Sequence, residues 1–320
     1  MMIFLQILTI LFNVLIFPGF LFVFVVGLLL AGIDRKILAR MQKRVGPPIL
    51  QPFYDFFKLM GKETIIPNAA NKAVYLIAPL AGLASLVVLM TFVPVFGYFA
   101  FSGSADLIVI LYLLTIPAVA MIIGGSASGS PYAGIGISRE MVTMMAYELP
   151  LIIVFLAIAK YVGGSYLCFS MENIIIFQQW EGCLIAHPAL IPAALAFLLI
   201  IPAEVGTQPF DVAEAETEIC EGPVVEYSGA PLGVFKLNTA IKMFVMTALF
   251  TNLFLGGIET GIVILNILIE VAICAGLTII CMTLIHAITA RLKVEHLFKF
   301  YWVIVAGLAL ISLILVFIGL

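Results

Sequence analysis

The sequence predicts an all-α polytopic membrane protein with about eight transmembrane helices. The chain of 320 residues is 64% hydrophobic and only 10% charged, so it has too few polar side chains to cover a soluble globule. Apolar runs of about 20 residues recur along its length, and each is long enough to cross a hydrocarbon core of roughly 30 Å. Such spans are helices, because membrane strands are shorter and alternate in polarity.

Eight apolar segments are long enough to span a bilayer. They cover approximately residues 4–31, 73–99, 106–125, 141–163, 188–204, 234–256, 261–288 and 299–319. The first segment is longer than the apolar core of a signal peptide and has no basic segment before it, so we expect it to be retained as an anchor. Residues 1–320 are therefore predicted to form a single integral membrane domain.

Basic residues are concentrated in alternate loops. The loop between the first two spans holds Arg35, Lys36, Arg40, Lys43, Arg44, Lys58, Lys62 and Lys72, whereas the even-numbered loops have essentially only Lys160. Lys and Arg accumulate in cytoplasmic loops. We therefore expect a multi-pass protein of the cell membrane, with loops 34–72 and 205–233 cytoplasmic and both termini external.

The loop 34–72 contains a predicted surface helix. Gly46-Pro47-Pro48 ends the extension of the first span. From Gln51 to Lys62, the charged residues Asp55, Lys58 and Lys62 fall on one face and apolar side chains occupy the rest, a pattern typical of a helix lying flat at a membrane surface. This helix is a surface anchor stabilised by an Asp55–Lys58 pair or a docking platform for a soluble partner, and the two roles are compatible.

The segment from Glu204 to Glu226 is acidic and contains no Lys or Arg. Its carboxylates are Glu204, Asp211, Glu214, Glu216, Glu218, Glu221 and Glu226. Carboxylates crowded together without counter-ions raise one another's pKa values. Ionisable groups in membrane proteins are costly and mark proton or ion routes, so this segment predicts proton handling.

A short acidic helix is predicted at about residues 212–221. Asp211, Glu214, Glu218 and Glu221 follow a spacing that places them on one helical face, with Glu216 pointing elsewhere. A capping box formed by Asp211 and Glu214 and a solvated acidic face are the structural alternatives. Neither explains the absence of Lys and Arg, so we favour a functional acidic funnel.

Four charges lie within or at the mouth of the spans. Glu140 and Glu148 are eight residues apart in the fourth span, hence roughly 40° apart around a helix and about 12 Å apart along it. They fit a proton relay, and a structural hydrogen bond is the alternative for Glu148. Lys242 is expected to snorkel or to meet an acid of the 205–233 loop. A direct pair of Lys242 with Glu270 is not expected.

The five Cys and three His are scattered and form no C-x-x-C motif. No iron–sulfur cluster or zinc site is therefore expected in this chain.

Several short motifs together resemble one family. They are Asp34-Arg35-Lys36, Arg44 to Pro48, Gln51-Pro52 to Lys62-Glu63, Tyr147-Glu148-Leu149-Pro150, Pro209-Phe210-Asp211 to Glu221, and Glu226-Tyr227-Ser228-Gly229. This combination resembles the NuoH-type heel subunit of respiratory complex I over nearly the whole chain. Within that family the chain looks most similar to the counterparts in energy-converting nickel–iron hydrogenases and related ferredoxin-dependent complexes.

The resemblance implies a subunit without redox chemistry of its own. It implies partners: a small iron–sulfur subunit and a large catalytic subunit, which would hold the iron–sulfur clusters and any nickel–iron site, antiporter-like membrane subunits and the lipid bilayer, with no nucleic acid. The proton path implied by the matching motifs consists of Glu140, Glu148, Glu204, Asp211, Glu214, Glu216, Glu218 and Glu221. The implied docking surface consists of Arg35, Lys36, Arg40, Arg44, Asp55, Lys58, Lys62, Glu63 and Tyr227.

One feature departs from the quinone-reducing members of that family. Only Pro48, Ile49 and Leu50 separate Gly46-Pro47 from Gln51-Pro52, where quinone-using members have a longer insert. Consecutive prolines also stiffen this segment. We therefore expect a complex that does not reduce a lipid quinone, with a sulfur-reducing complex, a quinone-reducing complex and a stand-alone transporter as alternatives.

Overall fold

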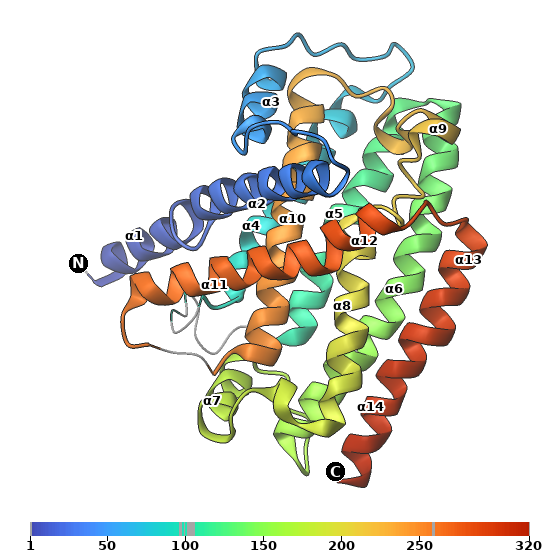
Figure 1. Ribbon diagram of the computed structural model, residues 1–320. Helices are drawn as coiled ribbons and strands as arrows, with labels where there is room; N and C mark the ends of the chain where they lie inside the picture. Colours follow the sequence, from blue (N-terminus) through green and yellow to red (C-terminus); the bar gives the residue numbers. More distant parts are fainter. Residues whose placement is uncertain (1, 96–97, 99, 101–105, 258–259, 320) are drawn as a thin grey trace.

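The computed structural model describes residues 2–95, 98, 100, 106–257 and 260–319, with the backbone alone for residues 2–5 and 216. Within these ranges the chain is helical apart from turns, loops and two isolated bridges (Figure 1). Eight helical stretches are long and apolar enough to cross a membrane. The predicted class, an all-α protein with eight spans, is confirmed.

The helices follow one another along the whole chain. They are α1 (Met2–Leu15), α2 (Phe20–Met41), α3 (Gln51–Met60), α4 (Lys72–Phe92), α5 (Leu107–Ser128), α6 (Pro131–Gly163), α7 (Met171–Glu181), α8 (Ile191–Val205), α9 (Glu216–Ile219), α10 (Gly229–Leu255), α11 (Val263–Thr278), α12 (Leu284–Ile288), α13 (Val294–Lys299) and α14 (Ala306–Ile318). The short 3₁₀ turns are η1 (Leu184–Ala186), η2 (Pro188–Leu190) and η3 (Gly222–Val224). The π-helical segments η4 (Ile279–Thr283) and η5 (Phe300–Val305) join α11 to α12 and α13 to α14.

Four predicted boundaries differ from the structure. The fourth span, expected at 141–163, begins earlier, with α6 at Pro131. The first span is broken between α1 and α2, where Pro18 has no amide hydrogen to donate, and α2 then runs on to Met41. The second span, expected to reach residue 99, ends with α4 at Phe92, and residues 96–97 and 99 lie outside the described part of the chain. The acidic helix expected at 212–221 is reduced to α9, so its predicted extent is wrong.

A helix also forms in the first loop, where α3 covers Gln51–Met60. Aromatic contacts hold it against the bundle: the ring of Phe24 in α2 meets those of Phe53 and Phe56 at centroid distances of 6.0 and 5.2 Å. Its place at a membrane surface stays a prediction.

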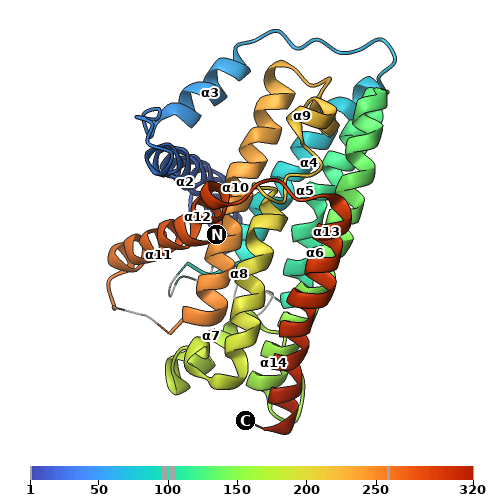
Figure 2. The ribbon, with the colours of Figure 1, turned by 45° about the vertical axis from the view of Figure 1, so that its right-hand side comes forward.

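The helix α10 forms the centre of the bundle. It lies between α2 on one side and α8 on the other in both ribbon views (Figure 2). Nearly all of its side chains are buried, as expected for a helix that is apolar on every face. Close approach to α2 depends on Gly27, since a Cβ there would lie 2.9 Å from the carbonyl oxygen of Ala240. Polar groups in its buried part, such as Lys242, therefore lie inside the bundle.

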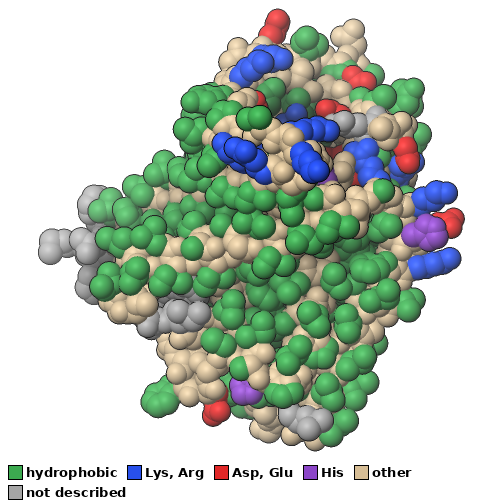
Figure 3. Space-filling view, in the orientation of Figure 1, with side chains coloured by type: hydrophobic (Ala, Val, Ile, Leu, Met, Phe, Trp, Pro, Cys, Tyr) green, Lys and Arg blue, Asp and Glu red, His purple; other side chains and the backbone are tan. Residues whose placement is uncertain are grey.

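The loops with α3 and α9 lie at one end of the molecule, and the C-terminus lies at the other (Figure 1). Lys and Arg side chains gather at the end that carries α3 and α9 (Figure 3). The basic asymmetry found in the sequence is thus an asymmetry between the two ends of the bundle. Which end faces the cytoplasm stays a prediction.

The segment after α9 is packed firmly onto α4, α5 and α6. Tyr227 stacks on Tyr75 with ring centroids 4.0 Å apart, and the Tyr75 hydroxyl donates to the carbonyl oxygen of Glu226 at 2.7 Å. Pro223 lies against Gly136 of α6. Tyr227 was expected on the docking surface, but it is buried and belongs to this packing because its ring fills the space beside Tyr75.

Gly136→Ala should loosen this packing. An added Cβ would lie 2.6 Å from Cδ of Pro223 and 2.8 Å from Cα of Gly222, so the loop must move, at a typical cost of about 1–3 kcal/mol. The control is Gly134→Ala on the same helix, where nothing lies within 4 Å of the new Cβ. Thermal unfolding in detergent should show a lower midpoint for Gly136→Ala alone. Equal midpoints for the two variants would contradict the packing described.

Candidate functional site

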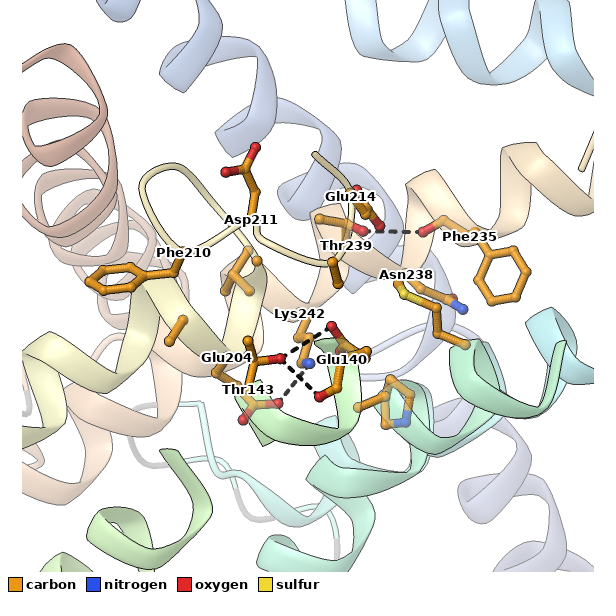
Figure 4. Close-up of a pocket in the computed structure, with 17 residues that line it drawn as sticks. Glu140, Thr143, Glu204, Phe210, Asp211, Glu214, Phe235, Asn238, Thr239 and Lys242 are labelled. Carbon is orange, nitrogen blue, oxygen red and sulfur yellow. Dashed lines mark hydrogen bonds and ion pairs between the residues drawn. The ribbon is translucent and has the colours of Figure 1, made fainter. Parts of the chain in front are cut away.

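A narrow cavity of about 40 Å³ lies among α5, α6, α8, α10 and the loop that follows α8 (Figure 4). Its ionisable and polar lining residues are Glu140, Thr143, Glu204, Asp211, Glu214, Asn238, Thr239 and Lys242. About 10–15 Å³ of such space holds one water molecule. The cavity therefore has room for a short row of waters and not for an organic substrate.

A buried ion pair closes the inner end of the cavity. Nζ of Lys242, on α10, lies 2.7 Å from Oε1 of Glu204, on α8, and the two side chains are 9% and 2% exposed. Removing either partner leaves an uncompensated buried charge. Glu204 also sits at the carboxyl end of α8, where the helix dipole disfavours a negative charge. Lys242 thus stabilises a carboxylate that the bundle could not otherwise hold.

This pair settles the expectation for Lys242. The side chain does not snorkel to the surface, and it meets the first carboxylate of the acidic segment. Glu270 lies elsewhere: it is fully buried and accepts a hydrogen bond from the amide of Asn252 at 3.1 Å.

Glu140 lies across the cavity from Glu204. The Thr143 hydroxyl donates to the carbonyl oxygen of Glu140 at 2.8 Å and lies 3.5 Å from its Oε2. Glu140 interacts electrostatically with both Lys242 and Glu204. Figure 4 shows Glu140 and Glu204 directed toward the same lysine from opposite sides. One ammonium group therefore faces two carboxylates.

Glu148 and Tyr147 lie farther along α6. Glu148 interacts electrostatically with Glu204 and Lys242, and Tyr147 interacts electrostatically with Glu204. Glu140 and Glu148, which the sequence places on similar sides of one helix, therefore both interact with the Lys242–Glu204 pair. Tyr147 was not predicted as a site residue; its position next to Glu148 in the sequence was the available signal.

Glu214 lines the outer part of the cavity, in the loop between α8 and α9. Burial raises the pKa of its carboxyl to about 7, and the negative charges of Glu140, Asp211 and Glu221 act in the same direction, while Lys236 opposes them. A carboxyl with this pKa gains and loses a proton readily at neutral pH. Glu214 and Glu140 therefore connect the loop to the inner ion pair.

The other acids of this loop are held by basic residues from distant parts of the chain. Asp211 accepts hydrogen bonds from Nε and Nη2 of Arg291, at 3.0 and 2.8 Å to Oδ2. Glu218 forms an ion pair with Arg139. The expectation of a loop without counter-ions is therefore wrong, because the counter-ions come from α6 and from the segment between α12 and α13. The expectation of one shared helical face is wrong as well, since α9 is too short to align these acids.

Glu221 has a left-handed backbone with φ +71° and is half-buried near Glu214. The side chain of Glu216 lies outside the described part of the chain.

The residues expected to dock a partner are mostly exposed. Arg35, Arg40, Arg44, Lys58, Lys62 and Glu63 are exposed, and Lys36 and Asp55 are half-buried. The expected Asp55–Lys58 pair is replaced by a different one: Nη1 of Arg35 lies 2.9 Å from Oδ2 of Asp55, and Gln51 also donates to Asp55. The extended α2 brings Arg35 over α3, which explains the change of partner.

A family model described as NADH dehydrogenase matches residues 13–317. Hydrogenase-4 component C of Escherichia coli is 36% identical over 228 residues, which cover 71% of this chain and 70% of that protein. A membrane-complex relative, formate hydrogenlyase subunit 4 of Escherichia coli, is 32% identical over 293 residues, 88% of this chain and 92% of that protein. A chain in the structure of the membrane-bound sulfane sulfur reductase, an archaeal respiratory membrane complex, superimposes with a TM-score of 0.85 at 31% identity, covering 97% of this chain and 99% of that one.

Lys242→Met should destabilise the protein more than the double variant Lys242→Met, Glu204→Gln. The single change leaves the carboxylate of Glu204 buried without its cation, at a cost of about 3–5 kcal/mol, whereas the double change removes both charges. Thermal unfolding of the purified chain in detergent measures the order. Additive losses, with the double variant the least stable, would mean that the pair contributes no coupling.

Glu214→Gln should flatten the pH dependence of stability between about pH 4.5 and 7. A carboxyl whose pKa rises on folding binds its proton more tightly in the folded state, so stability is lost as pH increases through this window. The loss is on the order of 1 kcal/mol or more, and Gln, which cannot titrate, avoids it. The unfolding midpoints of wild type and variant should diverge between pH 5 and pH 8, with the wild type falling further. The exposed Glu226→Gln serves as the control, and parallel curves for all three proteins would contradict the assignment.

Proposed function

Since the chain belongs to the NADH dehydrogenase family of membrane proteins, we propose that it anchors a peripheral iron–sulfur arm and couples electron transfer in that arm to proton movement through its own bundle. Its relatives are subunits of complex I-like and hydrogenase-type complexes, and a similar chain belongs to a sulfur reductase complex. The chain is a multi-pass membrane subunit of this kind. Its role in proton coupling is the proposal.

The observation that carries the proposal is the line of carboxylates from Glu214 through Glu140 to the Lys242–Glu204 pair. These groups come from different elements and meet around a cavity that is large enough for a few waters. Carboxyl groups joined by water are a means of moving protons through a low-dielectric interior. In a purely structural cluster each buried charge would have its own partner, whereas here the single ammonium group of Lys242 interacts with several carboxylates.

In the proposed path Glu214 exchanges protons with the loop side, because its pKa of about 7 lets both forms exist. Glu140 takes the proton inward. Lys242 pairs with Glu204 when Glu204 is ionised and turns to Glu140 when Glu204 is protonated, since it interacts with both carboxylates. Glu148 continues the path on the far side of the pair. Each proton transfer in this path therefore changes which carboxylate Lys242 pairs with.

The loop 205–233 supplies the link to the arm. We assign it, with loop 34–72, to the cytoplasmic side of one integral membrane domain, which leaves both termini external. A small iron–sulfur subunit and a large catalytic subunit would contact these loops and hold the clusters, with antiporter-like subunits beside the bundle. Arg139 and Arg291 tie the loop to α6 and to the segment before α13. A displacement of the loop by the arm would therefore alter the surroundings of Glu214.

The hydrogenase type is the favoured complex. Its support is the short, stiff connection between Gly46-Pro47 and Gln51-Pro52, together with the likeness to hydrogenase-4 component C. A sulfur-reducing complex is the second candidate, favoured by the superposition over 97% of this chain. The large soluble partner distinguishes them: four Cys ligands for nickel and iron indicate a hydrogenase, and missing ligands indicate another acceptor.

Glu214→Gln and Glu140→Gln should lower proton transport during turnover of the assembled complex by about tenfold or more, because loss of a positioned proton carrier typically costs about 10²–10⁴-fold in the proton-transfer step. Assembly, followed by co-purification of the arm, should be kept. Glu226→Gln removes an exposed charge from the same acidic segment and should leave transport within about twofold. Proton uptake into vesicles, measured together with electron transfer, tests this. Unchanged transport in both cavity variants would contradict the proposed path.

A further inference from the structure

A second cavity, of about 330 Å³, lies between α2, α3 and α10. This second cavity is more open than the first one. The two cavities have no lining residue in common. Close helix contacts frame it: Gly27 of α2 approaches Ala240 of α10, and Gly233 of α10 approaches the side chain of Leu59 in α3. The three helices meet around this space without filling it.

The cavity is strongly cationic. Arg35, Lys58, Lys62 and Lys236 line it, with Asp55 as the one lining carboxylate, so its formal charge is 4 − 1 = +3. Partial burial alone would raise the pKa of Asp55, but hydrogen bonds from Gln51 and Arg35 and the charge of Lys236 lower it overall. Asp55 is therefore ionised and engaged by Arg35.

Three lysines in this cavity are left to attract an anion. None of the ion pairs found among the described residues involves Lys58, Lys62 or Lys236. Like charges held together repel one another unless a counter-ion joins them. A bound anion would remove that repulsion.

Polarity changes along the cavity from charged to apolar. Leu28 and Arg35 both line it from α2 and are seven residues apart, hence about 10 Å along the helix. On α10, Lys236 lies near the loop end and Ala240 one turn deeper. The charged ends of both helices are at the loops and the apolar ends point into the bundle. A ligand that matches this gradient has an anionic end and a hydrocarbon end.

We propose that this cavity binds an anionic phospholipid, with the phosphate of its head group among Lys58, Lys62 and Lys236 and its acyl chains along the apolar end of α2 and α10. Basic pockets between membrane helices hold anionic head groups, and each nearby Lys or Arg favours such binding. The exposed rings of Tyr54 and Phe57, 59% and 61% accessible on the neighbouring α3, provide an adjoining apolar surface for the rest of the lipid. The lipid would join α3 to α2 and α10.

The chemistry favours this occupant over two others. A neutral lipid would leave the three lysines without a counter-charge. A free phosphate would match the lysines and leave the apolar end of the cavity empty. The same head-group chemistry can still come from either a lipid or inorganic phosphate, so the test includes both.

The test uses the full-length chain in nanodiscs of phosphatidylcholine, with phosphatidylglycerol added in increasing proportion. Thermal unfolding and native mass spectrometry measure stabilisation and retained lipid. The cavity variant is Lys58→Gln, Lys62→Gln, Lys236→Gln, all three exposed and none of them lining the first cavity. The control variant is Lys43→Gln, Lys72→Gln, Lys293→Gln, which removes the same charge from exposed positions that do not line the cavity.

We expect phosphatidylglycerol to raise the unfolding midpoint of wild type and control, with one lipid retained, and the apparent affinity of the cavity variant to fall about tenfold or more. Equal retention by wild type and cavity variant would overturn the proposal. So would equal stabilisation by phosphatidylcholine alone. Stabilisation of wild type in phosphatidylcholine by inorganic phosphate at the same concentration would assign the site to a free anion and overturn the lipid assignment.

Discussion

The ion pair between Lys242 and Glu204 is the interaction on which the rest of the site depends. A charge placed inside the bundle costs several kcal/mol unless an opposite charge faces it, and this pair lies where α8 and α10 meet, away from solvent. Glu140 and Glu148 are within electrostatic reach of the same lysine. One cation cannot compensate three carboxylates at once, so the surplus acids need a proton or water. This charge balance is the physical basis of the proposed proton exchange.

The loop outside the pair is held by a second set of charges. Asp211 is bound by Arg291 and Glu218 by Arg139, so two of the acids at the surface are fixed in place and Glu214 is left facing the cavity. The packing of Tyr227 on Tyr75 anchors the following segment. A loop fixed at these points can transmit a displacement at its surface to the titrating group beneath it. The same end of the molecule carries the cationic cavity beside α3, which has no lining residue in common with the cavity of the proposed proton path.

Much of the fold could be predicted from the sequence because lipid restricts the choice of structure: apolar runs of sufficient length must be helices, and the eight spans follow. The break at Pro18 and the early end of α4 are local events that hydropathy does not resolve. Glu140, Glu204 and Glu214 could be selected because carboxylates in and beside apolar spans are rare. The partners of Asp211 and Glu218 could not, since Arg291 and Arg139 are distant from them in the sequence. For Lys242 the sequence left two alternatives, and the contact with Glu204 is decided only by how α8 and α10 pack. The aligned acidic helix was wrong for the same reason: tertiary ion pairs outweighed local periodicity.

The measurement that tests the central claim most directly is infrared difference spectroscopy of the assembled complex as electrons are supplied to its arm. Protonated and ionised carboxyl groups absorb at different frequencies, so the spectrum reports proton exchange at the buried acids themselves. The account predicts a carboxyl signal that changes during turnover and is diminished in Glu140→Gln and in Glu214→Gln. Proton transport at the normal rate without any change in carboxyl bands would contradict it.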